Sequence, residues 1–208
     1  SRTKHQMLKR YLTNPSFLLL LAGNLYCIWY YQNHSNGFAT IVWVYWLQSV
    51  IIGLFNFADL LTIKNFDSGS FKLNGAPVTP NNKGCLAFFF LVHYGGFHLG
   101  YAIFLLVDIG VRNIDKAFLL IGVAAFLMES LSGFIKRKQQ PPAATLSIGS
   151  IFFLPYLRVV PMHLMILIPK FTGLTPSLIF LVLKMIADIL SFMLYQHIYN
   201  KNDEAGMK

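Results

Sequence analysis

Residues 40–61 read TIVWVYWLQSVIIGLFNFADLL and carry a single charged side chain, Asp59, near the end of the run. A helix needs about 20 mainly apolar residues to cross the ~30 Å hydrocarbon core of a bilayer. The run is continuously apolar, whereas a strand of a membrane barrel alternates between apolar and polar residues. This stretch therefore predicts a transmembrane helix.

Five further stretches have the same character, at residues 16–31, 85–110, 116–135, 146–168 and 176–199. Backbone groups inside lipid must form their hydrogen bonds within their own segment, which favours helices. No soluble segment is long enough to fold alone. We therefore expect an all-α, polytopic membrane protein, with six transmembrane helices in one bundle and one domain over residues 1–208.

The composition supports a membrane protein. Hydrophobic residues make up 55% of the chain and charged residues only 12%, against about 25% charged residues in a typical soluble domain. This excludes an ordinary soluble domain, a disordered chain and a disulfide scaffold. Cys27 and Cys85 are predicted at opposite faces of the membrane, so we expect two free thiols.

The distribution of Lys and Arg predicts the orientation. Twelve lie in the termini and in the second and fourth connections: Arg2, Lys4, Lys9, Arg10, Lys64, Lys72, Lys83, Lys136, Arg137, Lys138, Lys201 and Lys208. Three, Arg112, Lys116 and Lys170, lie on the other side. The positive-inside rule then places both termini in the cytoplasm. The +9 net charge mostly reflects this asymmetry. With no basic face interleaved with aromatic residues, nucleic acid is excluded as a partner, and the lipid bilayer is the expected one.

Ionisable residues at membrane depth are the candidate functional residues, because each costs at least ~2.5–3.5 kcal/mol at a helix centre. They are Glu129, Arg158, Lys184, Asp188, His93, His98 and His163. At 100° per residue, polar or small residues share one face on three of the predicted helices. The three polar stripes are Lys184, Asp188, Ser191 and Tyr195; Gln48, Ser49, Asn56 and Asp59; and Gly122, Ala125, Glu129 and Ser132. We expect the three stripes to meet inside the bundle.

The third predicted span contains HYGGFHLGY at residues 93–101. Gly96 and Gly100 form a GxxxG motif, which predicts that this face and His93 press against a neighbouring helix. Tyr94, His98 and Tyr101 form a second face. In the fifth span, Pro161 lacks an N–H and is expected to kink the helix beside Arg158 and His163.

A metal site is one hypothesis for the histidines. His93, His98 and His163 with Asp188 or Glu129 would suit zinc or another divalent metal. The alternatives are haem between two histidines, although no pair sits at matching depth on two helices, and histidines that only hydrogen-bond between helices. Glu129 with His93 would also suit a proton relay.

The charged residues allow two interpretations. Asp188 lies one turn from Lys184 and at the depth of Arg158, so one acid can neutralise two bases as a structural cluster. Alternatively, the excess positive charge is an anion-binding point near the midplane. In an enzyme, Asp188, Glu129 and Arg158 are the candidate catalytic residues.

Several landmarks resemble a bacterial family of six-helix integral-membrane proteins catalogued only as a domain of unknown function. They are Gly53-Leu54-Phe55-Asn56, the glycine-rich stretch between His93 and His98, Tyr156-x-Arg158 before His163, and Lys184-x-x-x-Asp188. The resemblance implies a multi-pass protein of the bacterial inner membrane and brings no activity with it.

Three classes of function fit these observations. The first is a membrane-embedded, metal-dependent enzyme with its site inside the bundle, and with a small molecule or a lipid as ligand. The second is a small transporter or channel with a polar pathway. The third is a structural or partner-binding membrane subunit.

Overall fold

The chain forms a bundle of long helices. The computed structural model describes residues 14–139, 145–172 and 176–200. The helices are α2 (Pro15–Asn33), α3 (Gly37–Thr62), α4 (Lys83–Phe104), α5 (Lys116–Gln139), α6 (Ile148–Phe153), α7 (Val159–Thr172) and α8 (Pro176–Asn200). A π-helical turn, η1 (Leu105–Ile109), extends α4, and a 3₁₀ segment, η2 (Leu154–Arg158), joins α6 to α7. Each predicted span therefore coincides with one helix or one continuous helical run.

Five helical runs in the described part of the chain are long and apolar enough to cross a membrane. They are Gly37–Thr62, Lys83–Ile109, Lys116–Gln139, Ile148–Ile168 and Ile179–Gln196. The helix α2 has 19 residues but is not among these five. The fold is thus helical and compatible with a multi-pass membrane protein.

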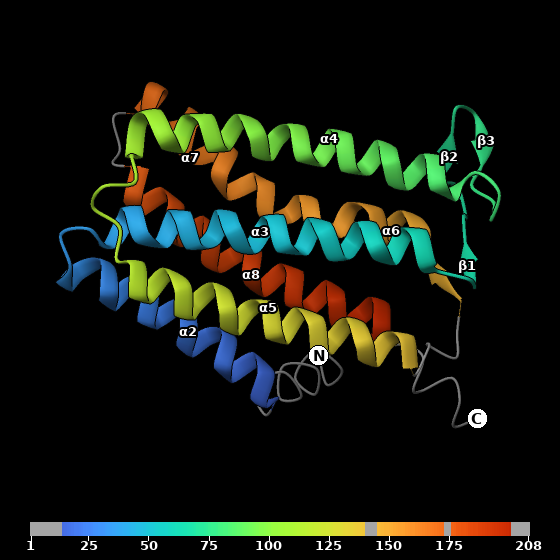
Figure 1. The fold of residues 1–208 in the computed structure, drawn as a ribbon, viewed down its shortest axis with the longest axis horizontal. Coiled ribbons are helices and arrows are strands. Elements are labelled where there is room, and N and C mark those ends of the chain that lie inside the picture. Colours follow the sequence, from blue (N-terminus) through green and yellow to red (C-terminus); the bar gives the residue numbers. More distant parts are fainter. Residues whose placement is uncertain (1–13, 140–144, 173–175, 201–208) are drawn as a thin grey trace, which may run out of the picture.

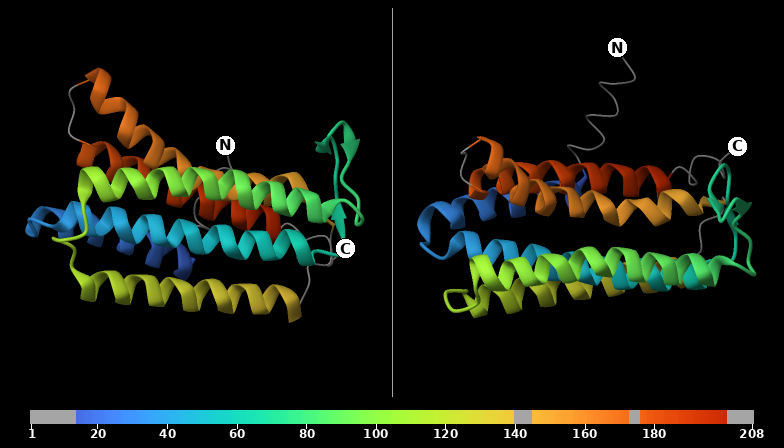
Figure 2. Two further views of the ribbon diagram at one scale, coloured as in Figure 1. Left: turned by 45° about the horizontal axis from the view of Figure 1, so that its top comes forward. Right: turned by 90° about the horizontal axis from the view of Figure 1, so that it is seen from above.

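The helices pack in two layers (Figures 1 and 2). One layer places α3 between α4 and α5, and the other places α8 between α7 and α2. Residues 63–82 and residues 145–147 lie at the same end of the bundle. We call this end the basic end, because Lys136, Arg137 and Lys138 also lie there.

Helix α3 forms the centre of the core. Tyr45 and Leu60 are completely buried, and the two tryptophans of α3 make hydrogen bonds to other segments. The indole of Trp43 donates to the carbonyl of Gly110 (2.9 Å), and that of Trp46 donates to the carbonyl of His98 (3.0 Å). These bonds tie α3 to α4 and to the turn that follows it.

A close approach between α3 and α4 depends on Gly53. A Cβ atom built on Gly53 would collide with the ring of Tyr94. The Tyr94 hydroxyl donates to the carbonyl of Ser49 (3.0 Å), so the ring lies against the glycine while its hydroxyl bonds one turn earlier on α3. The glycine is needed here for space.

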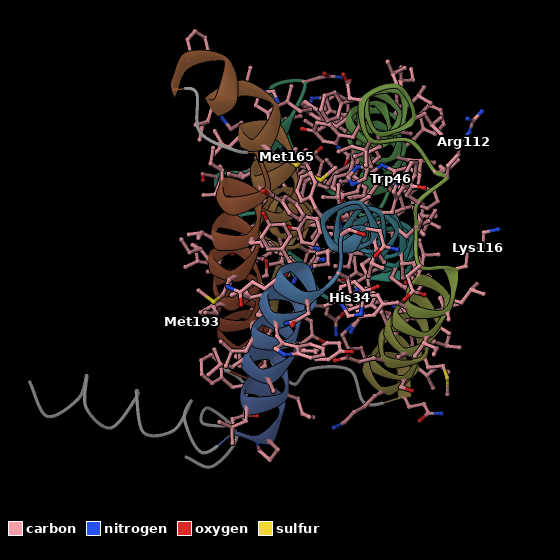
Figure 3. All side chains as sticks on the ribbon, turned by 90° about the vertical axis from the view of Figure 1, so that its left-hand side faces the viewer. His34, Trp46, Arg112, Lys116, Met165 and Met193 are labelled. Carbon is pink, nitrogen blue, oxygen red and sulfur yellow. The ribbon has the colours of Figure 1, made fainter. Side chains whose placement is uncertain are left out.

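Asp115 joins three helices at the end opposite the basic end. Its carboxylate accepts hydrogen bonds from the backbone N–H of Phe118 (3.0 Å) and from the Tyr30 hydroxyl (2.9 Å). The backbone N–H of Asp115 donates to the Thr40 hydroxyl (3.0 Å). The Phe118 N–H and then the Tyr30 hydroxyl hold the pKa of this carboxyl below its usual value. Figure 3 views the bundle from this end, where Arg112 and Lys116 point away from the helices.

The fifth span does not form one regular α-helix. Its geometry changes at η2, which ends at Arg158, and Pro161 lies in the first turn of α7. A first-turn residue has no intrahelical partner for its N–H, so proline is tolerated there. Short strands lie in the connections at the basic end: β1 (Phe66–Asp67) pairs in parallel with β4 (Leu146–Ser147), and β2 (Lys72–Leu73) pairs antiparallel with β3 (Ala76–Pro77).

The two cysteines, Cys27 and Cys85, are free thiols, as predicted. Six of the basic residues used for the orientation lie outside the described residues: Arg2, Lys4, Lys9, Arg10, Lys201 and Lys208.

Candidate site inside the bundle

Arg158 and Asp188 form a buried ion pair between η2 and α8. The Nη1 atom of Arg158 lies 2.7 Å from Oδ1 of Asp188, and the two residues expose only 7% and 8% of their surface. Arg158 also donates from Nε to the Ser49 hydroxyl (3.2 Å) and from Nη2 to the Gln48 side-chain oxygen (3.2 Å). One guanidinium thus connects α8 to α3.

Lys184 completes the cluster from the same helix as Asp188. Its Nζ atom lies 2.7 Å from Oδ2 of Asp188 and donates to Oδ1 of Asn24 on α2 (2.9 Å). Lys184 is 7% exposed and Asn24 5% exposed. As expected from the sequence, Asp188 points into the bundle and contacts both bases. We call Arg158, Lys184 and Asp188 the charged cluster.

Tyr45 on α3 supports the charged cluster with its ring and its hydroxyl. The guanidinium carbon of Arg158 lies 4.2 Å from the ring centroid, and Nζ of Lys184 lies 5.7 Å from it. Such a contact stabilises a cation most when both groups are shielded from water. The Tyr45 hydroxyl donates to the backbone carbonyl of Arg158 (3.2 Å), so it satisfies an acceptor where the helix changes from 3₁₀ to α geometry.

The charged cluster contains one positive charge in excess, because two bases share one carboxylate. A guanidinium has five N–H donors and an ammonium three. The contacts with described residues use three of the donors on Arg158 and two of those on Lys184. Both bases therefore keep donors for a further oxygen. The arrangement can hold an anion beside the Arg158–Asp188 pair.

A second ion-pair group lies nearer the basic end. The Asp59 carboxylate contacts Nη2 of Arg137 (2.7 Å) and Nζ of Lys138 (2.9 Å). Arg137 also donates from Nη1 to the Tyr195 hydroxyl (2.8 Å). Asp59 lies on α3, Tyr195 on α8 and both bases on α5. We call Asp59, Arg137, Lys138 and Tyr195 the end cluster.

The three histidines lie apart. His98 is buried, and its Nδ1 lies 3.0 Å from the carbonyl of Tyr94 in the preceding turn. Nδ1 of His93 lies 2.8 Å from the Tyr156 hydroxyl, and Nδ1 of His163 lies 3.3 Å from the Tyr101 hydroxyl. Among the described residues, no three His, Cys, Asp or Glu side chains lie together in a way that could hold a metal ion. The structure therefore does not assemble the proposed metal ligands.

The GxxxG face of α4 does not press against a helix, contrary to the prediction. No atom would lie within 4 Å of a Cβ atom added at Gly96 or Gly100. Both glycines instead line an open apolar groove of about 650 Å³ between α4 and α7, together with His93 and His163. Figure 2 shows α7 diverging from the bundle towards its C-terminal end, which is why α4 has no close neighbour there.

Glu129 lies on the outside of the bundle, although the sequence placed it inside. The helix α5 lies at the edge of its layer and buries none of its residues, and Glu129 is exposed. Of the small residues on the same stripe, Gly122 does meet α3, because a Cβ atom there would lie 3.5 Å from Val44. The expected relay between Glu129 and His93 is not formed, since His93 pairs with Tyr156.

Four contributors to these clusters were not singled out as site residues from the sequence: Asn24, Tyr45, Arg137 and Lys138. Asn24 is the one strongly polar residue in the middle of its span, and this signal could have identified it. Arg137 and Lys138 were counted only as charges that set orientation. Tyr45 was hidden in an aromatic run, where nothing distinguishes a ring that contacts a cation from one that only packs.

A comparison with protein-family models gives one finding about identity. The model described as "Family of unknown function (DUF6498)" matches residues 6–207. This match confirms the resemblance to an uncharacterised family that the sequence landmarks indicated. Neither the curated proteins nor the solved structures include a match to this chain.

Proposed function

We propose that this chain, which belongs to the DUF6498 family of unknown function, binds a small anion at the charged cluster and carries it across a membrane. The observation behind the proposal is the excess base buried among α2, α3, η2 and α8. A buried charge without a counter-charge is costly. A carboxylate or phosphate oxygen at the unused donors of Arg158 and Lys184 would supply that counter-charge.

The end cluster favours transport over simple binding. It places two further bases, Arg137 and Lys138, between the charged cluster and the basic end, and bases along a route lower the energy of an anion throughout it. Two positions that both favour an anion, one buried and one near the surface, are what stepwise movement needs.

The membrane arrangement belongs to the same proposal. We infer six spans, with α2 as the sixth, both termini in the cytoplasm, and residence in the inner membrane of a bacterium. The apolar length of α2 and the excess of Lys and Arg at the basic end support this topology. Reporter fusions after Asn36 and Asn113 should report the outer side, and a fusion after Asn74 the cytoplasm. A reversed pattern would refute the orientation.

Anion flux into proteoliposomes tests the transport proposal. Chloride, phosphate and small carboxylates are offered in turn to vesicles that contain the parent protein or the Lys184→Met variant. Methionine keeps most of the side-chain volume and leaves the Arg158–Asp188 pair neutral. We expect flux of at least one anion in the parent and a loss of roughly tenfold or more in the variant, since one uncompensated charge is removed. No flux of any anion, or equal flux in both proteins, would refute the proposal.

A membrane-embedded enzyme is the second candidate, and the groove between α4 and α7 favours it. His93 and His163 both line this apolar groove, and an imidazole can serve as a general acid or base. A lipid-soluble substrate could enter such a groove from the bilayer. Elemental analysis and an optical spectrum of the purified protein test the metal-dependent or haem form of this candidate.

A further inference from the structure

Two arginines connect α3 to α8 in the same manner at two levels of the bundle. Arg158 contacts Ser49 on α3 and Asp188 on α8. Arg137 contacts Asp59 on α3 and Tyr195 on α8. Ser49 and Asp59 are ten residues apart, which is about 15 Å along a helix. The two arginine contacts therefore enclose a layer of the bundle between them.

Two polar side chains in this intermediate layer are incompletely bonded. Asn56 lies on α3 between Ser49 and Asp59, and Ser191 lies on α8 between Asp188 and Tyr195. The Nδ2 atom of Asn56 and the hydroxyl oxygen of Ser191 are both buried and have no hydrogen-bond partner among the described residues. Asn56 as a whole is only 9% exposed.

Unpartnered buried donors are costly, at about 1–3 kcal/mol each, and native proteins usually satisfy such groups with water. At 100° per residue, Asn56 shares a helix face with Ser49, and Ser191 shares one with Tyr195. The arginine contacts direct both faces towards the space between α3 and α8. Water in this layer would satisfy both orphan groups and would join the charged cluster to the end cluster.

We propose that the space between α3 and α8 is a water-accessible route from the basic end to the charged cluster, and that the contact of Arg137 with Asp59 closes it. That the route admits an anion rests on the function proposed above. That water reaches the charged cluster along it does not depend on that function. Arg137 is suited to the closing role because its long side chain can release Asp59 and extend towards the lipid headgroups.

Reaction of introduced cysteines with an anionic methanethiosulfonate tests the route, because this reagent needs water to reach a thiol. The background protein carries Cys27→Ala and Cys85→Ser and is held in nanodiscs, so that both faces are accessible. Ser191→Cys and Asn56→Cys probe the layer from its two helices. Ala87→Cys is the matched control, since Ala87 is buried on α4, in the layer that does not contain α8. Only variants that elute as a single species and unfold near the background temperature are compared.

We expect Cys at 191 or 56 to react faster than Cys at 87. Adding Asp59→Asn should accelerate the reaction roughly tenfold, because both bases of the end cluster lose their carboxylate and the open state gains population. Positions 191 and 56 reacting as slowly as position 87, with and without Asp59→Asn, would overturn the route. A fast reaction that Asp59→Asn leaves unchanged would overturn the closing role of Arg137.

The outcome separates this inference from the proposed function. A reactive thiol at 191 in a protein without anion flux would leave the route standing and refute transport. Anion flux in a protein whose positions 191 and 56 stay unreactive would support transport and refute the route.

Discussion

Replacing Asp188 by alanine removes the carboxylate that contacts both Arg158 and Lys184 at 2.7 Å. Two cations, each about nine-tenths buried, would then face each other without a counter-charge. Removing one partner of a buried ion pair typically costs about 3–5 kcal/mol. At about 2–4 °C per kcal/mol for a chain of this size, we expect Asp188→Ala to lower the Tm by roughly 6–20 °C.

Two further variants separate charge from shape. Asp188→Asn keeps the volume and one acceptor oxygen, so it should cost less stability than Asp188→Ala. Lys184→Met leaves the Arg158–Asp188 pair intact and removes the excess base, so its cost should also be smaller. In the double variant Asp188→Ala/Lys184→Met, one unpaired cation remains instead of two. Its cost should therefore fall short of the sum of the single variants by about 0.5–3 kcal/mol.

Thermal unfolding of the purified variants in one detergent, followed by intrinsic fluorescence, measures these differences. Glu129→Ala is the matched control, because it also removes a carboxylate from a long helix but at an exposed position, and its effect should stay within about 0.5 kcal/mol. An Asp188→Ala protein as stable as the parent would refute the account of the charged cluster. A Glu129→Ala protein as unstable as Asp188→Ala would show that the loss is not specific to burial.

Other expectations concern packing and pH. Gly53→Ala should destabilise the protein by about 1–3 kcal/mol, because its Cβ atom collides with the ring of Tyr94, whereas Gly96→Ala should leave the Tm unchanged, since Gly96 has open space around it. Equal shifts in the two variants would contradict this packing. The lowered pKa of Asp115 stabilises the fold above the usual carboxyl pKa, and this contribution is lost as the pH falls through the lowered value. The Tm of the parent should therefore exceed that of Asp115→Asn at pH 7, and the difference should shrink below about pH 4; a difference that persists unchanged at low pH would exclude the carboxylate as its cause.

Helical periodicity predicted the parts of the site that depend on one helix at a time. Lys184 and Asp188 lie one turn apart on α8, and Ser49, Asn56 and Asp59 lie close together around α3, so the arithmetic of 100° per residue identified both polar faces. The high cost of charges in lipid then indicated that these faces turn inward. The pairing of Asp188 with both bases followed from these two arguments.

Features that depend on the neighbours of a helix were not predictable from its own pattern. Glu129 shares a face with small residues, which is typical of helix contact, but α5 lies at the edge of the bundle and exposes that residue. Gly96 and Gly100 likewise form a motif of close packing, yet α7 diverges and leaves a groove there. The position of a helix within a layer, which decides both cases, is a property of the whole bundle.

The distribution of partners within the charged cluster also has a consequence for biosynthesis. Lys184 and Asp188 belong to the same helix, one turn apart, so α8 can enter the membrane as a segment that is already internally neutralised. Arg158 precedes its carboxylate by thirty residues, and its own helical run offers no acid among residues 148–168. In the membrane topology proposed above, the helical run at residues 148–168 would therefore remain next to the insertion machinery, or near water, until α8 emerges from the ribosome. Membrane integration of this chain should accordingly be cooperative at its C-terminal end, with translation of α8 committing the preceding segment to the lipid.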